Sequence, residues 1–503
     1  MRLVSIFSTL VLAAAGVCAQ QGPDVRNLTL QESLALSIQQ NLDLQIERLN
    51  PQLSLYDLSE AYGQYDPSFS WSGQRQHNEA GSRLLGGGFE LPGEVQDSDS
   101  FRSSLGGLTP WGMTYSLQGG VSDTYGNSFN LATNGNVLEN PFESSAGSVS
   151  IELRQPLLKN FWIDQTRLSI RVAKNRIKWS EQGLRQRLMT VITSTEQTYY
   201  NLIAARELVK AQETAVELAS RLLEENRKRV EVGALAPLDE KQAEAQTASS
   251  KADLIEAEYL VSLQEHQLKS LISSEYSEWA KKTLVPAETL AAPQKLLNRQ
   301  DSWSQGLSLR PELIQAKLDA ERAGLQVKYA RNQLLPQVDV FGSYGYNGSG
   351  IEFSDALGDV TSRDRPFHSF GGQIVMPLVN TSARNRFRSS QTQEQQAILA
   401  LKRMEQQIMV QIDDDLARVE SGYQRVQATR AAREYAEAAL LAEQKKLESG
   451  KSTSFQVLQL QRDLTTARGS EIRALADYNR ALAQLSLSEG TTLQRHNVDV
   501  DFR

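Results

Sequence analysis

Three consecutive aspartates are the most obvious candidates for metal chemistry in this sequence. Asp413, Asp414 and Asp415 lie in a segment whose apolar residues repeat as they do in a helix. Consecutive residues of a helix point about 100° apart, so the three carboxylates cannot converge on one ion. The sequence therefore favours a hydrated acidic stretch, of the kind that lines an aqueous lumen, over a metal site.

The other groups that could do chemistry are few and scattered. The four histidines, which have no metal-ligand spacing, are His77, His266, His368 and His496. We find no nucleophile and base pair, no phosphate-binding loop and no dinucleotide signature. The net charge is −7 over 503 residues and no dense basic tract occurs, which argues against a nucleic-acid partner. We therefore predict no catalytic residue, no metal and no cofactor, and a protein that is not an enzyme.

The N-terminus predicts a secreted protein. Arg2 precedes an apolar stretch from Leu3 to Val17, which is shorter than the about 20 residues of a membrane-spanning helix. Ala19 suits a signal-peptidase site, so we expect residues 1–19 to be a signal peptide. A lipid anchor on Cys18, the only cysteine, is the alternative. No second long apolar run follows and the mean hydropathy is −0.41, so a membrane role would require a closed β-barrel.

The rest of the chain is organised as two tandem repeats. The matching landmarks are Pro67 and Pro336, Pro156 and Pro377, and Gly233 and Gly450. The separation falls from 269 to 221 residues between the first two pairs, so the first copy holds 48 additional residues. This insertion, residues 76–147, is read as an elaborated loop with a strand, a turn and a strand near residues 105–115. It would either lengthen a barrel wall or form a hairpin outside the cell.

Each copy is expected to contain one very long helix. In the first copy it runs over residues 158–231, about 100 Å at 1.5 Å per residue. Apolar residues share a seven-residue register at Leu188, Leu202, Val209, Val216, Leu223 and Val230, and then at Ile412, Val419, Val426, Leu440 and Leu447. Ala205 and Ala219 continue a neighbouring seam. This register predicts coiled-coil packing, which would also suit a fibrous coiled coil.

Short amphipathic segments separate the long helices. Apolar residues alternate with polar ones at Phe69 and Trp71, at Val149, Ile151 and Leu153, and at Val338, Val340, Tyr344 and Tyr346. One apolar and one polar face are what a transmembrane barrel strand requires, although a soluble sandwich also alternates. Four strands cannot close a barrel, whereas three copies of the chain would supply twelve. Glu152 and Arg154 lie on the polar face and are our candidates for the lumen.

These features together resemble the outer-membrane efflux protein family, which includes the TolC channels. The resemblance runs from Leu28 to Gly490 and is most specific at residues 61–67, 155–158 and 232–245. It implies a homotrimer with a twelve-stranded barrel in the outer membrane of a Gram-negative-type bacterium and most of its mass in the periplasm. It also implies two partners, a periplasmic adaptor protein and an inner-membrane pump of the RND or ABC type.

The resemblance also directs attention to the periplasmic tip of the tunnel. Gly233 and Gly450 end the long helices, as glycine suits the left-handed turn after a helix. Related proteins place aspartates just past the second glycine, where this chain has Gln456 and Gln459, so a neutral polar constriction is expected. Asp239 matches an acidic family position, and Lys451 is a partner for it by charge, unless both are simply solvated. The gate candidates are Asp239, Gln242, Lys451, Gln456 and Gln459.

The predicted fold is mainly α with membrane β: a periplasmic α-barrel of long coiled-coil helices and about four strands per chain. The expected segments are the signal peptide (1–19), an N-terminal helical segment (20–65), the strands and external loop of the first repeat (66–157), its long helices (158–305), the first helix of the second repeat (306–335), its strands (336–377), its long helices (378–490) and a flexible tail (491–503). The predicted function is a passive exit duct of a tripartite efflux or type I secretion system. A coiled-coil structural or adaptor protein of the cell envelope is the alternative.

Overall fold

The computed structural model describes residues 24–86, 88–133 and 135–498. The predicted signal peptide and Cys18 lie outside this range. The chain folds as two units, which we name by their content. The sheet unit comprises residues 47–186 and 310–407, and the helical unit comprises the chain up to residue 46, residues 187–309 and the chain from residue 408 onward.

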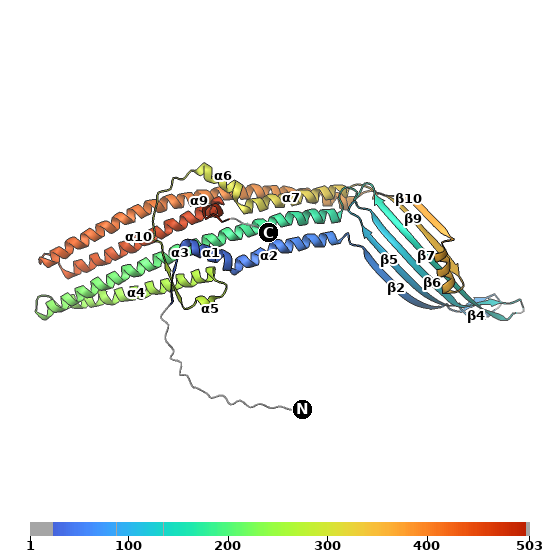
Figure 1. Ribbon diagram of the computed structural model, residues 1–503, viewed down its shortest axis with the longest axis horizontal. Coiled ribbons are helices and arrows are strands. Elements are labelled where there is room, and N and C mark those ends of the chain that lie inside the picture. Colours follow the sequence, from blue (N-terminus) through green and yellow to red (C-terminus); the bar gives the residue numbers. More distant parts are fainter. Residues whose placement is uncertain (1–23, 87, 134, 499–503) are drawn as a thin grey trace, which may run out of the picture. The chain divides into compact units, whose positions relative to one another are not determined.

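The two repeats agree closely in their helices (Figure 1). The matching helices are α2 (Leu42–Gly63) and α7 (Pro311–Asn332), with 22 residues each; α3 (Gln165–Glu231) and α9 (Thr381–Glu448), with 67 and 68; and α4 (Pro237–Ile272) and α10 (Ser454–Glu489), with 36 each. Pro237 and Pro311 stand in the first turn of their helices, where proline loses no hydrogen bond. The order expected from the repeat is therefore confirmed.

The predicted seven-residue seam forms the core of the helical unit. In the second copy, Ile412, Val419 and Val426 are almost completely buried, and Leu440 and Leu447 follow them. In the first copy Leu188 and Leu202 are buried, while the seam positions beyond them toward the end of α3 are half-buried. Burial of a seam of this length is what stabilises helices that have a modest local preference.

A sheet of six strands, counted over the described residues, occupies the sheet unit. We call it the main sheet. Its order is β10 (Pro366–Val375), β9 (Gln337–Gly350), β7 (Val137–Pro156), β6 (Thr114–Leu131), β5 (Val95–Leu108) and β2 (Ser68–Glu79), with every neighbouring pair antiparallel (Figure 1). The expected count of about four is thus corrected to six, because the insertion supplies β5 and β6. They lie side by side with the other strands of the main sheet. The insertion also contains a short hairpin outside this sheet, formed by β3 (Arg83–Leu85) and β4 (Phe89–Leu91).

The remaining elements are short. They are β1 (Asp24–Leu28), α1 (Leu30–Gln40), β3 (Arg83–Leu85), β4 (Phe89–Leu91), α5 (Tyr276–Trp279), β8 (Lys282–Pro286), α6 (Arg299–Leu309), α8 (Phe353–Ser362) and α11 (Thr492–Arg495). Strand β1 pairs in parallel with β8, a pairing that the sequence did not reveal. No helix within the described ranges is both long and apolar enough to cross a membrane.

The chain end differs from the predicted flexible tail. Thr492 and Leu493 are buried, and both Arg495 and His496 contact the buried carboxylate of Glu196, at 3.0 and 3.2 Å. Because Glu196 sits inside the helical unit, these contacts tie residues 491–498 to it. The remaining five residues lie outside the described range.

Candidate functional site: the sheet wall and the helical tips

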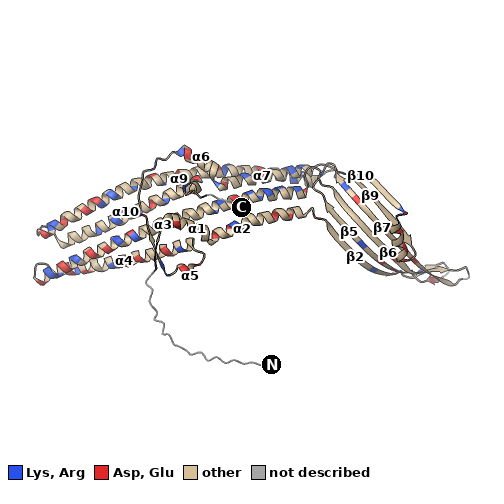
Figure 2. Ribbon diagram, viewed as in Figure 1, with Lys and Arg blue, Asp and Glu red and all other residues tan. Residues whose placement is uncertain are grey.

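The main sheet has one apolar and one polar face. Across four strands, Phe69, Leu105, Leu117 and Ile151 stand in one row of paired residues, and Ser68, Gly106, Ser116 and Glu152 form the adjoining row. Side chains of adjoining rows point to opposite faces. All four apolar side chains are exposed. Charged residues are dense along the helices and sparse on the strands (Figure 2).

The two lumen candidates lie on the polar face, as predicted. Glu152 pairs with Ser116 on one side and Ser343 on the other. Arg154 lies 3.6 Å from the carboxylate of Asp339, whose side chain is nearly buried. The guanidinium also lies over the ring of Phe341, at 5.8 Å. Arg154 is therefore in contact with both a carboxylate and an aromatic ring of the neighbouring strand β9.

The two glycines end the long helices in the same way. Gly233 and Gly450 have φ of 75° and 73°, the left-handed region that favours glycine. The N–H of Ala234 donates to the carbonyl of Arg229 at 2.7 Å, and the N–H of Lys451 donates to the carbonyl of Lys446 at 2.8 Å. This bond across six residues is the Schellman pattern. We call the turns that follow α3 and α9 the first tip and the second tip.

The predicted gate residues occupy these tips without forming one cluster. Asp239 is half-buried in the first turn of α4, next to half-buried Gln242, and Lys451 is exposed in the second tip. Across the described residues, no ion pair joins Asp239 to Lys451. Gln456 and Gln459 are exposed and uncharged. Gln456 accepts from the Ser452 hydroxyl at 2.9 Å, and Gln459 donates to Asp463 at 3.2 Å.

Sequence reasoning missed Asn226, which connects the two tips. Its side chain is completely buried. The amide carbonyl accepts from the hydroxyl of Ser454, the first residue of α10, at 2.9 Å, and the amide nitrogen donates to the backbone carbonyl of Asp239 at 3.4 Å. Asn226 follows Ala219 by seven residues, in a seam that also contains Ala205 and the polar Gln212. Its position in the seam was the available signal, because a polar seam residue can fix register.

Ion pairs surround both tips. In the first, Arg227 contacts Glu240 at 3.2 Å and Glu244 at 3.5 Å, and Lys241 contacts Glu244 at 2.8 Å. The hydrogen bond from Lys241 is the main reason why the pKa of Glu244 lies below its usual range. In the second tip, hydrogen bonds from Lys446 and Ser452 lower the pKa of Glu443. Because the basic partners Arg227, Lys241 and Lys446 are exposed, each pair contributes little stability.

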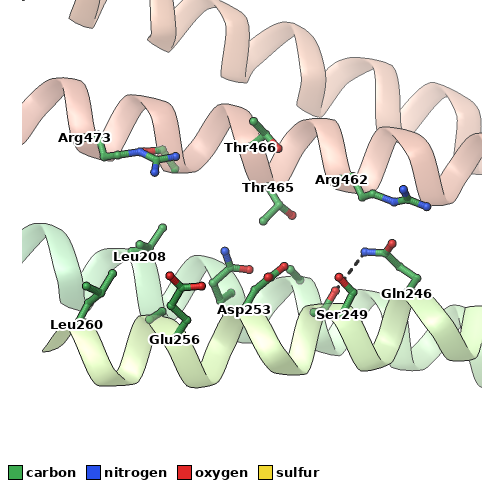
Figure 3. Close-up of a pocket in the computed structure, with 15 residues that line it drawn as sticks. Leu208, Gln246, Ser249, Asp253, Glu256, Leu260, Arg462, Thr465, Thr466 and Arg473 are labelled. Carbon is green, nitrogen blue, oxygen red and sulfur yellow. Dashed lines mark hydrogen bonds between the residues drawn. The ribbon is translucent and has the colours of Figure 1, made fainter. Parts of the chain in front are cut away.

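A groove lies between α4, α10 and α3 in the helical unit (Figure 3). Its volume is about 410 Å³. Asp253 and Glu256 of α4 line one side of it, and Arg462 and Arg473 of α10 line the other (Figure 3). Ligand pockets are lined mainly by apolar groups, whereas most of the residues around this groove are polar or charged. The groove therefore suits hydrophilic contacts.

The three consecutive aspartates have separate structural contacts. Asp413 accepts from the indole N–H of Trp303 at 3.1 Å and contacts Arg299 at 3.2 Å. Asp415 is buried and accepts from the hydroxyl of Ser488 at 2.6 Å. Asp414 is exposed. The expected hydrated stretch is thus corrected: the side chains diverge as predicted, but two of them hold α9 to neighbouring helices.

Comparison with known proteins identifies the family. Residues 121–274 and 303–491, well over half of the chain, match the family described as outer membrane efflux protein. The chain belongs to this family. Membership confirms both the family and the outer-membrane location expected from the sequence.

Individual relatives agree with this assignment. The chain is 27% identical over 233 residues to outer membrane protein TolC of Vibrio cholerae, a match that covers 43% of this chain and only 50% of that protein. It is 23% identical over 337 residues to outer membrane efflux protein BepC of Brucella suis, covering 66% of this chain and 70% of that protein. The structure matches the CmeC outer membrane channel of Campylobacter jejuni with a TM-score of 0.66 at 15% identity, over 100% and 99% of the two chains. The expected combination of long helices and a strand sheet is thus confirmed as the fold.

Proposed function

We propose that this protein is the outer-membrane exit duct of a tripartite efflux or type I secretion system. It conducts substrates passively, and an inner-membrane pump supplies the energy. The observation that carries the proposal is the main sheet, which exposes an apolar face opposite a polar one in a member of the outer membrane efflux family. Lipid covers the part of the apolar face that α8 leaves open, and water and solute contact the polar face that bears Glu152 and Arg154.

Copies of the chain close the wall. Within the described residues β2 pairs only with β5 and β10 only with β9, so the main sheet has two free edges. A strand edge in lipid must be paired, because no water is present to satisfy its backbone groups. Strand β2 has 12 residues and β10 has 10, and they run antiparallel to each other, so β2 of one copy can pair with β10 of the next.

The helices that adjoin these edges also have unpartnered apolar residues. On α2, Leu49, Leu53 and Tyr56 are exposed at spacings of four and three residues. On α9, Ile398 and Leu399 are exposed. Such a stripe is typical of a helix that packs against another helix. Contact between unlike surfaces of identical copies forms a ring when the rotation between neighbouring copies closes. Three copies in such a ring are the homotrimer that the sequence resemblance implies.

The two helical tips receive the partners. We infer that a periplasmic adaptor contacts the turns at Gly233 and Gly450 and that the pump docks through it. Asp239, Gln242, Lys451, Gln456 and Gln459 then form the constriction, which is held shut by many weak polar contacts, since exposed pairs contribute only about 0–1 kcal/mol each. Photo-crosslinkers at Ala234 and Lys451 should capture a coiled-coil adaptor, and capture of no envelope protein from intact cells would count against this step.

Membrane fractionation of a seam variant tests the assembly. The wild-type protein should be found in the outer-membrane fraction as an oligomer that dissociates only on heating. Leu53→Asp places a charge in the apolar stripe, so it should abolish this oligomer. Leu296→Asp is the matched control, because Leu296 is 95% exposed and belongs to none of the elements α2, α9, β2 and β10. A water-soluble wild-type monomer that needs no detergent would contradict the proposal.

A further inference from the structure

Strands and helices of the sheet unit follow one another in the same lateral order. Strand β2 continues α2, β7 leads into α3, β9 continues α7 and β10 leads into α9. Ala61 of α2 packs with Ile170 and Ala173 of α3. The amide of Asn175 on α3 donates to the carbonyl of Leu318 on α7 at 3.1 Å, and Gly324 of α7 faces Glu394 of α9. Four neighbouring helices therefore have four corresponding strands, β2, β7, β9 and β10.

The hairpin of β5 and β6 has no corresponding helix. It lies between β2 and β7, although α2 and α3 are direct neighbours. Its strands are paired along 12 residues with β2, 14 with each other and 18 with β7. The hairpin turn is closed by Thr109, whose hydroxyl donates to the carbonyl of Met113 at 2.9 Å. Pairing of this extent makes the hairpin part of the wall.

Helix α8 braces the added strands from the apolar face. The ring of Phe353 on α8 meets the ring of Phe101 on β5 edge to face at 6.0 Å. Gly348 allows β9 and α8 to approach each other closely, because a Cβ at this position would lie 2.2 Å from the carbonyl oxygen of Ala356 on α8. A helix from the second repeat thus holds strands that only the first repeat contains.

Resting on the proposed function, we infer that three copies build a wall of eighteen strands, six described strands from each, in place of twelve. Strands are about 4.8 Å apart and tilted by about 40° in such walls, which gives a backbone diameter of about 36 Å for eighteen strands and about 24 Å for twelve. With about 5 Å of side chain on each side, the lumen is about 26 Å wide instead of about 14 Å.

The width of the helical layer agrees with this wall. Four helices about 10 Å apart cover an arc of about 40 Å per chain. Six tilted strands cover about 38 Å, whereas four cover about 25 Å. With the hairpin of β5 and β6, the width of the main sheet is therefore about equal to the width of the four helices that adjoin it. An exit of this width passes cargo as broad as a folded helical hairpin, about 20 Å across, which a twelve-stranded wall would exclude.

Electron microscopy of the detergent-solubilised full-length assembly, combined with its native mass, tests the inference. We expect three chains and eighteen strands around a wall about 36 Å across. A closed wall of twelve strands would overturn the inference while leaving the duct intact, whether it came from two chains or from three with the hairpin outside. A protein that forms no closed wall would overturn the proposed function itself.

A deletion variant supplies a second readout. Residues of β2 and β7 that share a row, such as Ser68 and Glu152, can pair directly once Val95–Leu131 is removed, because an antiparallel pair of strands changes neither direction nor face. The variant should build a twelve-stranded wall about 24 Å across. Removal of Arg83–Leu91, which lies outside the main sheet, is the control and should leave eighteen strands. Should the shortened chain not assemble, the strand count of the full-length protein decides.

Discussion

The two repeats match in their helices and differ in their strands. The long helices have 67 and 68 residues, and the helices that follow them have 36 each. Between the landmarks Pro67 and Pro156 the first copy supplies four strands of the main sheet, whereas the second supplies two strands and α8 between Pro336 and Pro377.

This difference shows which part of the fold tolerates insertion. A seam of packed seven-residue repeats keeps its register only if its length is preserved, because an insertion rotates every later residue away from the partner helix. A sheet edge or interior accepts an antiparallel pair of strands, since the chain returns to the same end with its faces unchanged. The helical part is therefore constrained in length, and the wall can be widened two strands at a time.

The strongest test of the comparison uses one seam position in both copies. Leu440 is 4% exposed, whereas the matching Leu223 of the first copy is half-buried. Leu440→Ala should lower the free energy of unfolding by about 2–5 kcal/mol, as is usual for a buried leucine. Leu223→Ala should cost clearly less. Thermal unfolding followed by the helical circular dichroism signal measures both, and equal losses would show that the two seams are packed alike.

The second test concerns the contact between the tips. Asn226→Ala leaves the buried hydroxyl of Ser454 without its acceptor, and an unpaired buried polar group costs about 1–3 kcal/mol. We expect faster hydrogen exchange in both tips, although only one was changed. Adding Ser454→Ala should cost little more, because the two residues share one interaction. If the two substitutions had additive effects, or if hydrogen exchange changed only in the first tip, the contact of Asn226 with Ser454 would not couple the two tips.

The third test asks whether both glycine turns need the left-handed backbone. Gly233→Ala and Gly450→Ala should each destabilise by about 1–2 kcal/mol, the cost of a non-glycine residue in that conformation. Gly358→Ala in α8 is the control, because an added Cβ there meets nothing within 4 Å and its φ is not positive. It should leave stability unchanged or slightly higher. Urea denaturation measures the free energy of unfolding of each variant. If only one of the two glycine substitutions lowered it, the two turns would not be equivalent.

The smallest effect is expected from acid. The folded-state pKa values of Glu244 and Glu443 lie below their usual range, so their pairs stabilise the tips above the ordinary pKa of about 4.3. This contribution is lost as the pH falls through the lowered value. Hydrogen exchange measured at about pH 6 and about pH 3.5, and corrected for intrinsic rates, should show weaker protection of both tips at the lower pH. Glu244→Gln should remove the acid-induced loss of protection in the first tip and leave that of the second tip. If the first tip of this variant still lost protection in acid, protonation of Glu244 would not be the cause.

The sequence predicted those features that depend on periodicity. The seam from Leu188 to Val230 follows from a pattern of seven residues, and the placement of Glu152 and Arg154 on a polar face follows from a pattern of two. The breaks at Gly233 and Gly450 follow instead from the preference of glycine for the left-handed turn after a helix. The strand, turn and strand expected near residues 105–115 are the end of β5 and the start of β6, whereas the polar residues 95–104 of β5 resemble a loop and were not predicted as strand. The contact of Asn226 with Ser454 joins residues 228 apart, so no local pattern could reveal the pairing.

Conductance across a planar lipid bilayer tests the central claim most directly. The account predicts that the purified assembly inserts and carries a passive ion current that is proportional to voltage. The current should be larger for the variant that combines Asn226→Ala with Ser454→Ala, because the contact between its tips is gone. A protein that inserts in both forms and never conducts would contradict the account.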